Sequence, residues 1–158
     1  MIFSGDECSV SLEIKGSKIW SRIGTKPLFP TTTRKGEVKV FGALNNKNGK
    51  VLTLTSNKIN QYIFIKFLKK LLRYYKKVFL VVDNASWHKA KKVNEFLEEN
   101  NHRLQINYFP RYSPEYNPSE QCWKALKRDL LTTKLFVSTE GMKDEVQTYF
   151  NEKHFFWS

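Results

Sequence analysis

Three acidic residues in separate parts of the chain have the surroundings expected of metal ligands. Asp83 directly follows the apolar run 78–82, Glu120 stands at the start of an expected helix, and Asp6 lies in an extended N-terminal segment. Reactive groups of open α/β sheets gather at the carboxyl ends of strands, and an aspartate there is costly to bury unless it is paired, protonated or bound to metal. Three converging carboxylates also repel one another, so protons or cations must compensate for their charge.

The chemistry that such a cluster supports is metal-dependent reaction at phosphodiesters. Carboxylate oxygens suit Mg²⁺ or Mn²⁺. Two such ions roughly 4 Å apart can activate an attacking oxygen and stabilise the leaving oxygen. The sequence contains neither a recognisable Ser–His–Asp set nor a glycine-rich phosphate loop. We expect a nucleic acid and no small-molecule substrate. A metal-dependent nuclease or strand-transfer enzyme is the class that these residues favour.

The two later acids each have an alternative structural role. Glu120 could close a capping box with Asn117 as the N-cap of its helix. It also extends the apolar stripe of that helix toward the sheet edge, and helical phase leaves both roles open. Asp83 could cap the helix that follows it, although Asn84 or Ser86 is better placed for that.

The first acid has a neighbour that competes with it. Residues 1–15 alternate in polarity, and the even-numbered positions are the more apolar. This alternation predicts that Asp6 points inward and Glu7 outward, provided that no bulge precedes Val10. Glu7 stays the rival candidate for the first acid.

Other side chains could support the acids or bind an anionic partner. Asn84 could brace the Asp83 carboxylate, and His88 is expected in a supporting or structural role, either near a metal-bound water or phosphate or in local hydrogen bonds. The formal net charge of +12 favours nucleic acid as the partner. The candidates for DNA contact are Arg22, Lys26, Arg34, Lys35, Lys89, Arg111 and Lys124.

The composition describes an ordinary globular domain. The chain has 158 residues, of which 41% are hydrophobic and 15% aromatic, enough for one domain with its own core. It has no apolar run long enough to span a membrane and no recognisable signal peptide. Cys8 and Cys122 form no CxxC pair, and two cysteines without a secretory signal favour free thiols in a reducing compartment. If the acids converge, these thiols come within roughly 15 Å of each other.

The patterning predicts strands first and β–α alternation later, which favours an α/β fold with a mixed sheet and helices on both faces. Residues 23–36 are expected to form a loop, and Asn48-Gly49 a hairpin turn. The expected strands are 1–15, 18–22, 37–44, 51–55, 78–82 and 104–108, and the expected helices are 60–75, 86–100, 118–131 and 139–152.

Two segments carry a resemblance to a known family. LVVDNASWHKA and FPRYSPEYNPSEQCWKALK resemble the signature blocks of mariner-superfamily transposases, most closely the insertion-sequence-630 group. The opening, with Asp6-Glu7 followed by Trp20, Gly24 and Pro27, resembles the first block more weakly. Two departures are small: the spacing from Asp83 to Glu120 is slightly long, and Ser119 stands where isoleucine is frequent.

The resemblance implies an RNase H-like fold with a five-stranded core sheet, so one of the six expected strands would be an edge addition or a misassignment. It also implies a DDE active site of Asp6, Asp83 and Glu120 with two Mg²⁺ or Mn²⁺ ions, Asp6 and Asp83 sharing one and Glu120 binding the other. The implied activity is that of a transposase catalytic domain, which cuts DNA at the ends of a mobile element and joins the 3′-hydroxyl to target DNA.

Several expectations about the whole protein follow from that resemblance. The chain would be a single catalytic domain, residues 1–158, without the helix-turn-helix domains that usually precede it. We expect DNA and possible homodimer partners, no membrane, and a cytoplasmic, nucleoid-associated protein of a prokaryotic host. The alternatives are a decayed or domesticated nucleic-acid-binding protein on the same fold, or another RNase H-like nuclease.

Overall fold

The N-terminal strand lies at the centre of a five-stranded mixed sheet. The computed structural model describes residues 1–12, 22–25, 35–110, 116–131, 134 and 136–156. The strand order is β3-β2-β1-β4-β5, and β1 pairs antiparallel with β2 and parallel with β4. The strands are β1 (Ile2–Ser11), β2 (Glu37–Asn45), β3 (Val51–Ser56), β4 (Val78–Val82) and β5 (Leu104–Tyr108).

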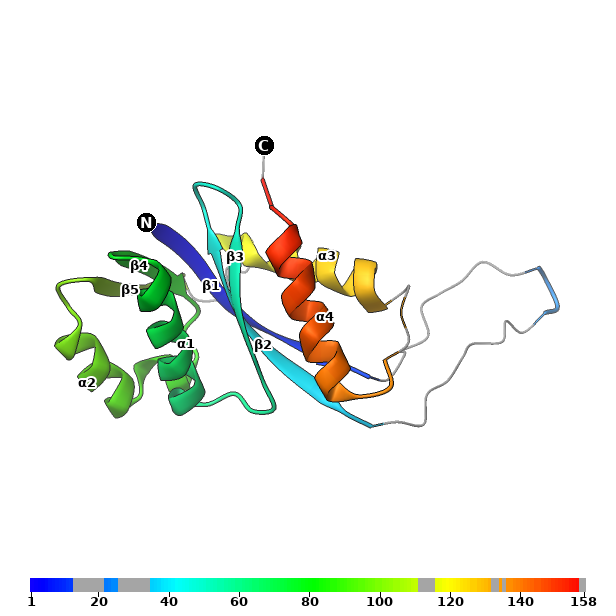
Figure 1. Cartoon of the computed structure of the whole chain (residues 1–158), viewed down its shortest axis with the longest axis horizontal. Coiled ribbons are helices and arrows are strands. Elements are labelled where there is room, and N and C mark those ends of the chain that lie inside the picture. The colour runs from blue at the N-terminus through cyan, green and yellow to red at the C-terminus, as the bar shows by residue number, and fades with distance from the viewer. Residues whose placement is uncertain (13–21, 26–34, 111–115, 132–133, 135, 157–158) are drawn as a thin grey trace.

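Helices cover both faces of this sheet, as predicted (Figure 1). One face packs against α1 and α2 through a core that includes Phe3, Phe41 and Leu80. The other packs against α3 and α4 through a core that includes Cys8 and Leu126. The helices are α1 (Gln61–Tyr74), the 3₁₀ turn η1 (Ser86–Lys89), α2 (Lys91–Glu99), α3 (Ser119–Leu126), the π-helical turn η3 (Lys127–Leu131) and α4 (Thr139–Glu152).

Local sequence signals account for several of these boundaries. The Asn60 side chain caps α1 by accepting hydrogen bonds from the backbone N–H groups of Tyr62 and Ile63. Gly49 has a φ of 69° in the turn between β2 and β3, a conformation that glycine adopts without strain. The predicted strands 37–44, 51–55, 78–82 and 104–108 and the predicted helices 60–75 and 139–152 are confirmed to within one residue at each end. The predicted strand 1–15 is a strand over Ile2–Ser11, and its residues 13–15 lie outside the described part of the chain.

Three predictions about the elements need correction. The segment 86–100 is not one helix, because the chain is extended at Ala90 with ψ of 149°, which separates η1 from α2. The helix predicted over 118–131 changes from α to π geometry after Leu126. In β1 the odd-numbered face is also covered, since Phe3 is fully buried against the α1 side.

Some expectations fall partly outside the described residues. Of the expected strand 18–22, only Arg22 is described, and it is not in a strand. Within the described residues, no helix is both long and apolar enough to cross a membrane. Cys8 and Cys122 are both buried and free, so they are not paired with each other.

Candidate active site

Asp6 is held on the central strand by a tryptophan from α3. Its Oδ2 accepts a hydrogen bond from Trp123 Nε1 at 3.0 Å, and its Oδ1 accepts one from the Glu7 N–H at 2.9 Å. Gly42 pairs with Asp6 across the β1–β2 ladder, and a Cβ atom at Gly42 would lie 2.4 Å from the Trp123 ring. The glycine therefore leaves the space in which the indole reaches Asp6.

The electrostatics of Asp6 suit a cation-binding group. Burial raises the pKa of Asp6, and the charges of Glu7 and Asp83 add to this, while the hydrogen bonds from Glu7 N–H and Trp123 oppose it; the resulting pKa is about 6. The ionised carboxylate is thus poorly solvated and near like charges. A divalent cation would relieve both penalties, so the site fits such an ion.

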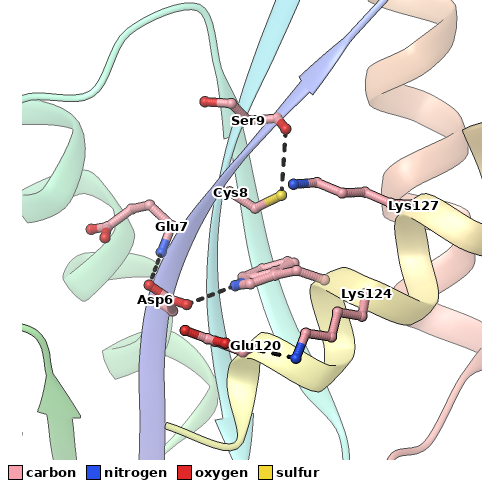
Figure 2. Close-up of a pocket in the computed structure, with 8 residues that line it drawn as sticks. Asp6, Glu7, Cys8, Ser9, Glu120, Lys124 and Lys127 are labelled. Carbon is pink, nitrogen blue, oxygen red and sulfur yellow. Dashed lines mark hydrogen bonds and ion pairs between the residues drawn. The ribbon is translucent and has the colours of Figure 1, made fainter. Parts of the chain in front are cut away.

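Glu120 faces the same pocket from the first turn of α3. The helix start is fixed to β1 because Ser119 Oγ donates to the Ser4 carbonyl at 2.8 Å. Asn117 Oδ1 accepts a hydrogen bond from the Ser119 N–H at 3.1 Å, so this asparagine does cap the helix start, as the capping-box alternative expected. Among the described residues the Glu120 carboxylate does not complete the box, and it lies 3.9 Å from Lys124 Nζ. Figure 2 shows the Asp6 and Glu120 carboxylates approaching each other at this pocket.

The pocket joins the two acids to basic side chains. Its volume is about 380 Å³. Lys124 and Lys127 line it together with Asp6 and Glu120. Lysines beside carboxylates suit a pocket that receives a phosphate group as well as cations.

Asp83 ends β4 next to the strand that carries Asp6. Ser4 pairs with Val81 in the parallel ladder, and the same register continued by two residues aligns Asp6 with Asp83. Asp83 Oδ1 accepts from the Ala85 N–H at 3.0 Å and lies 3.1 Å from His88 Nδ1. The His88 hydrogen bond is the main reason that the pKa of Asp83 is lowered. Asp83 is not the N-cap of η1, which is Ala85.

Glu7 does not point to solvent, and that prediction is wrong. Its side chain is only 8% exposed, because η1 covers the face of β1 opposite Asp6. Glu7 Oε1 lies 2.8 Å from His88 Nε2 and accepts a hydrogen bond from Trp87 Nε1 at 3.4 Å. Burial alone would lower the pKa of His88, but hydrogen bonds to Asp83 and Glu7 and the charge of Glu7 outweigh it and raise the pKa to about 9.

The acids gather more loosely than a preformed two-ion site would require. Among the described residues, the one group of three candidate ligands whose atoms all lie within 4.8 Å of one another is Glu7, Asp83 and His88. Both ring nitrogens of the buried His88 already have partners within the protein, Nε2 at Glu7 and Nδ1 at Asp83, which argues against an ion at that position. Asp6 and Glu120 share a pocket and Asp83 lies at the adjacent strand end, so their joint ligand role stays a prediction.

Asn84 has partners other than the Asp83 carboxylate. It donates to the Phe109 carbonyl at 2.7 Å and accepts from Lys89 Nζ at 2.7 Å. Lys89 in turn lies over the Tyr108 ring, 4.5 Å from its centroid. Asn84 therefore ties the end of β4 to the end of β5.

The predicted DNA contacts are only partly described. Lys124 lies at the pocket and Lys89 next to the end of β4, whereas Arg22 and Lys35 are exposed near the ends of the undescribed segments. Lys26, Arg34 and Arg111 lie outside the described residues.

Sequence reasoning missed the roles of Trp123 and Gly42. Trp123 is a core residue of the α3 side, and its position three residues after Glu120, on the same side of the helix, is the one signal in the sequence for its contact with Asp6. Gly42 gives no signal until the β1–β2 register is known.

The fold and the family comparison together define a class of protein. A mixed five-stranded sheet with this strand order and helices on both faces is an RNase H-like architecture. The chain belongs to the DDE superfamily endonucleases, whose family model matches residues 1–143.

One curated relative has a clear sequence similarity. It is the insertion element IS630 uncharacterized 39 kDa protein of Shigella sonnei, 31% identical over 128 residues, which cover 79% of this chain and 37% of the relative. The chain therefore spans well under half of that protein.

Solved structures confirm the predicted RNase H-like fold. The chain is similar to the Mos1 transposase in a paired-end complex with the left transposon end, with a TM-score of 0.71, 22% identity, and coverage of 96% of this chain and 48% of that one. The crystal structure of the catalytic domain of Mos1 mariner transposase matches with a TM-score of 0.60, 19% identity, and coverage of 96% and 70%.

Proposed function

We propose that this chain is the catalytic domain of a DNA transposase, which cuts phosphodiester bonds at the ends of a mobile element and joins them to target DNA. The observation that carries the proposal is the shared pocket of Asp6 and Glu120, beside Asp83, with the pKa of Asp6 raised to about 6. The relative from an insertion element and the Mos1 complexes with transposon ends support the same assignment.

Asp6, Asp83 and Glu120 would hold two Mg²⁺ or Mn²⁺ ions. Bound ions of this kind polarise the phosphate and lower the pKa of the attacking oxygen. Mos1 paired-end complexes have been solved with Mn and with Mg, which supports the choice of metal. In this chain Trp123 orients Asp6, His88 orients Asp83, and Lys124 and Lys127 attract the phosphate to the pocket.

The partners and cellular setting are part of the proposal. DNA is the expected partner because the chain carries a net charge of +12 with lysines at the pocket. We also propose that residues 1–158 act as one catalytic domain, that two copies work on paired element ends, and that the protein operates in the cytoplasm at the nucleoid of a prokaryotic host.

A strand-joining reaction tests the proposed function. Labelled duplexes with pre-cut ends of the mobile element are incubated with the chain, a supercoiled target plasmid and Mn²⁺. Label joined to the plasmid is the expected result, and Asp83→Ala should abolish it. Nicking without joining would favour another RNase H-like nuclease, and DNA binding without any metal-dependent product would favour the non-catalytic alternative.

A crystal soaked in Mn²⁺ tests the ligands directly. We expect anomalous scattering between Asp6, Asp83 and Glu120. Density at Glu7 and His88 instead would refute the ligand assignment.

A further inference from the structure

Two neighbouring acids on β1 leave the strand on opposite faces. Figure 2 shows the Glu7 side chain pointing away from the Asp6 and Glu120 carboxylates. Glu7 is nevertheless nearly buried, at 8% exposure, and its partner His88 is fully buried. A carboxylate withdrawn from water in this way needs a specific partner, and the imidazole provides it.

His88 connects this acid to a second one. Its Nε2 lies 2.8 Å from Glu7 Oε1, and its Nδ1 lies 3.1 Å from Asp83 Oδ1 and 3.2 Å from the Asp83 carbonyl. Ionised carboxylates and carbonyls only accept hydrogen bonds, so the ring donates on both sides. The ring is also packed against Phe64, with 4.4 Å between centroids, which limits its rotation.

Asp83 has few other restraints. Its side chain is 53% exposed, and its other described hydrogen bond comes from the Ala85 N–H. The orientation of its carboxylate therefore depends strongly on His88, and the orientation of His88 depends on the buried Glu7.

We propose that Glu7 is a positioning residue, which fixes the His88 ring and through it the Asp83 carboxylate. The inference rests on the proposed role of Asp83 as a metal ligand. Glu7 itself binds no ion: it acts from the far face of β1, through one imidazole. Partners of this kind commonly change metal affinity by about 10- to 100-fold when they are removed.

The inference is tested by titrating the full chain with Mn²⁺ in the absence of DNA and measuring the affinity by calorimetry. Glu7→Ala and His88→Ala should each weaken Mn²⁺ binding by about 10- to 100-fold. Because Glu7 acts through His88, the double variant should bind Mn²⁺ as His88→Ala does. Glu7→Gln can still pair with the ring and should stay close to the wild type. If the losses of Mn²⁺ affinity add up in the double variant, Glu7 acts independently of His88. If Glu7→Gln loses as much affinity as Glu7→Ala, Glu7 acts through its charge. Either result would overturn the proposal.

Two controls separate positioning from general damage. Val93→Ala removes buried volume from the α2 core, so it should lower the unfolding temperature and leave Mn²⁺ affinity unchanged. A similar loss of affinity in Val93→Ala would mean that instability alone weakens binding. Asp83→Ala should abolish Mn²⁺ binding at the proposed site. If Asp83→Ala binds Mn²⁺ as the wild type does, the proposed function is overturned together with this inference. If Asp83→Ala loses Mn²⁺ binding but Glu7→Ala keeps wild-type affinity, only this inference is overturned.

A metal-free measurement remains decisive even if Glu7→Ala does not fold. Proton NMR of the wild-type chain should show two slowly exchanging ring N–H signals from His88, and Glu7→Gln should shift mainly the Nε2–H signal. Rapid exchange of both signals in the wild type would refute the arrangement.

Discussion

Asp6 and Glu7 are adjacent in sequence, yet the two faces of β1 treat them in opposite ways. Asp6 faces α3 and a pocket, has a tryptophan as its side-chain donor, and has its pKa raised to about 6. Glu7 faces η1 and is compensated by the protonated ring of His88. One face therefore leaves negative charge available to an added cation, and the other neutralises it within the protein.

This difference shows that acidic residue type alone does not identify a metal ligand. A buried carboxylate with a built-in cation is a structural element, whereas one with only neutral donors is a candidate for metal binding. The distinction lies in the covering element, α3 or η1, rather than in β1 itself.

The largest expected effect is the difference in DNA cleavage between variants of Asp6 and of Glu7. If the two acids were interchangeable, this difference would vanish and the comparison would fail. Asp6→Asn should lower metal-dependent DNA cleavage by on the order of 10³-fold, because a metal ligand is lost. Glu7→Gln should retain cleavage within about 10-fold of the wild type. Nicking of supercoiled plasmid in Mn²⁺ measures both, and the reverse ranking would make Glu7 the first acid of the site.

Removal of the histidine should expose the cost of burying Glu7. His88→Ala should lower the free energy of unfolding by about 3–5 kcal/mol, since it leaves a buried carboxylate unpaired. Asp6→Asn should destabilise far less in metal-free protein. The Asp6 pKa of about 6 against 3.8 corresponds to about 3 kcal/mol of unfavourable free energy for the ionised carboxylate at pH 7. The amide removes that charge but can accept only one of the hydrogen bonds from Trp123 and the Glu7 N–H. Urea unfolding in EDTA compares the two variants, and a loss in Asp6→Asn as large as that in His88→Ala would contradict the assignment of an uncompensated charge.

The same histidine predicts a pH dependence. The folded-state pKa of about 9 lies above the ordinary 6.5, so the stabilisation is complete below pH 6.5 and is lost as the pH rises through 9. The free energy of unfolding of the wild type should therefore fall by about 3 kcal/mol more than that of His88→Ala over this range. Parallel curves for the two proteins would show that the ring is neutral at pH 7.

A smaller effect should come from crowding the tryptophan that holds Asp6. Gly42→Ala places a Cβ atom 2.4 Å from the Trp123 ring, so the indole must move away from the carboxylate. Overpacking of this kind costs about 1–3 kcal/mol. Urea unfolding and the tryptophan emission spectrum measure the change. Wild-type values for both would show that β2 shifts to accommodate the Cβ atom without moving Trp123, which would contradict this prediction.

The smallest expected effect concerns DNA affinity. Lys124→Ala removes a pocket cation and should lower the slope of log affinity against log salt by about 1. Lys66→Ala, on the exposed surface of α1, is the matched control and should leave the slope unchanged. Fluorescence anisotropy with a labelled duplex at several salt concentrations measures both slopes, and equal slopes for Lys124→Ala and the wild type would exclude a phosphate contact by Lys124.

Much of the fold was predictable because local patterns and tertiary packing agree. The Asn48-Gly49 turn, the Asn60 cap and the apolar run 78–82 each specify an element without help from distant residues. The break at Ala90 was not predictable in this way, because η1 takes its place from the contacts of His88 across β1.

The candidate site shows the same limit. Positions after a strand and at a helix start pointed to Asp83 and Glu120. Alternation correctly put Asp6 and Glu7 on opposite faces, but it cannot reveal that a second layer covers the Glu7 side. The match between Gly42 and Trp123 depends on strand register, which no single segment encodes.

The placement of β1 also bears on when the proposed site can form during synthesis of the chain. This first strand lies between partners from later in the chain, and the Ser119–Ser4 hydrogen bond brings α3 to it across 115 positions. A nascent chain released early, before α3 is synthesised, would carry Asp6 in water with no companion acid from that helix. If the proposed cutting activity depends on this site, translation products that lack α3 should not cut DNA, and the site would form only once α3 has been synthesised.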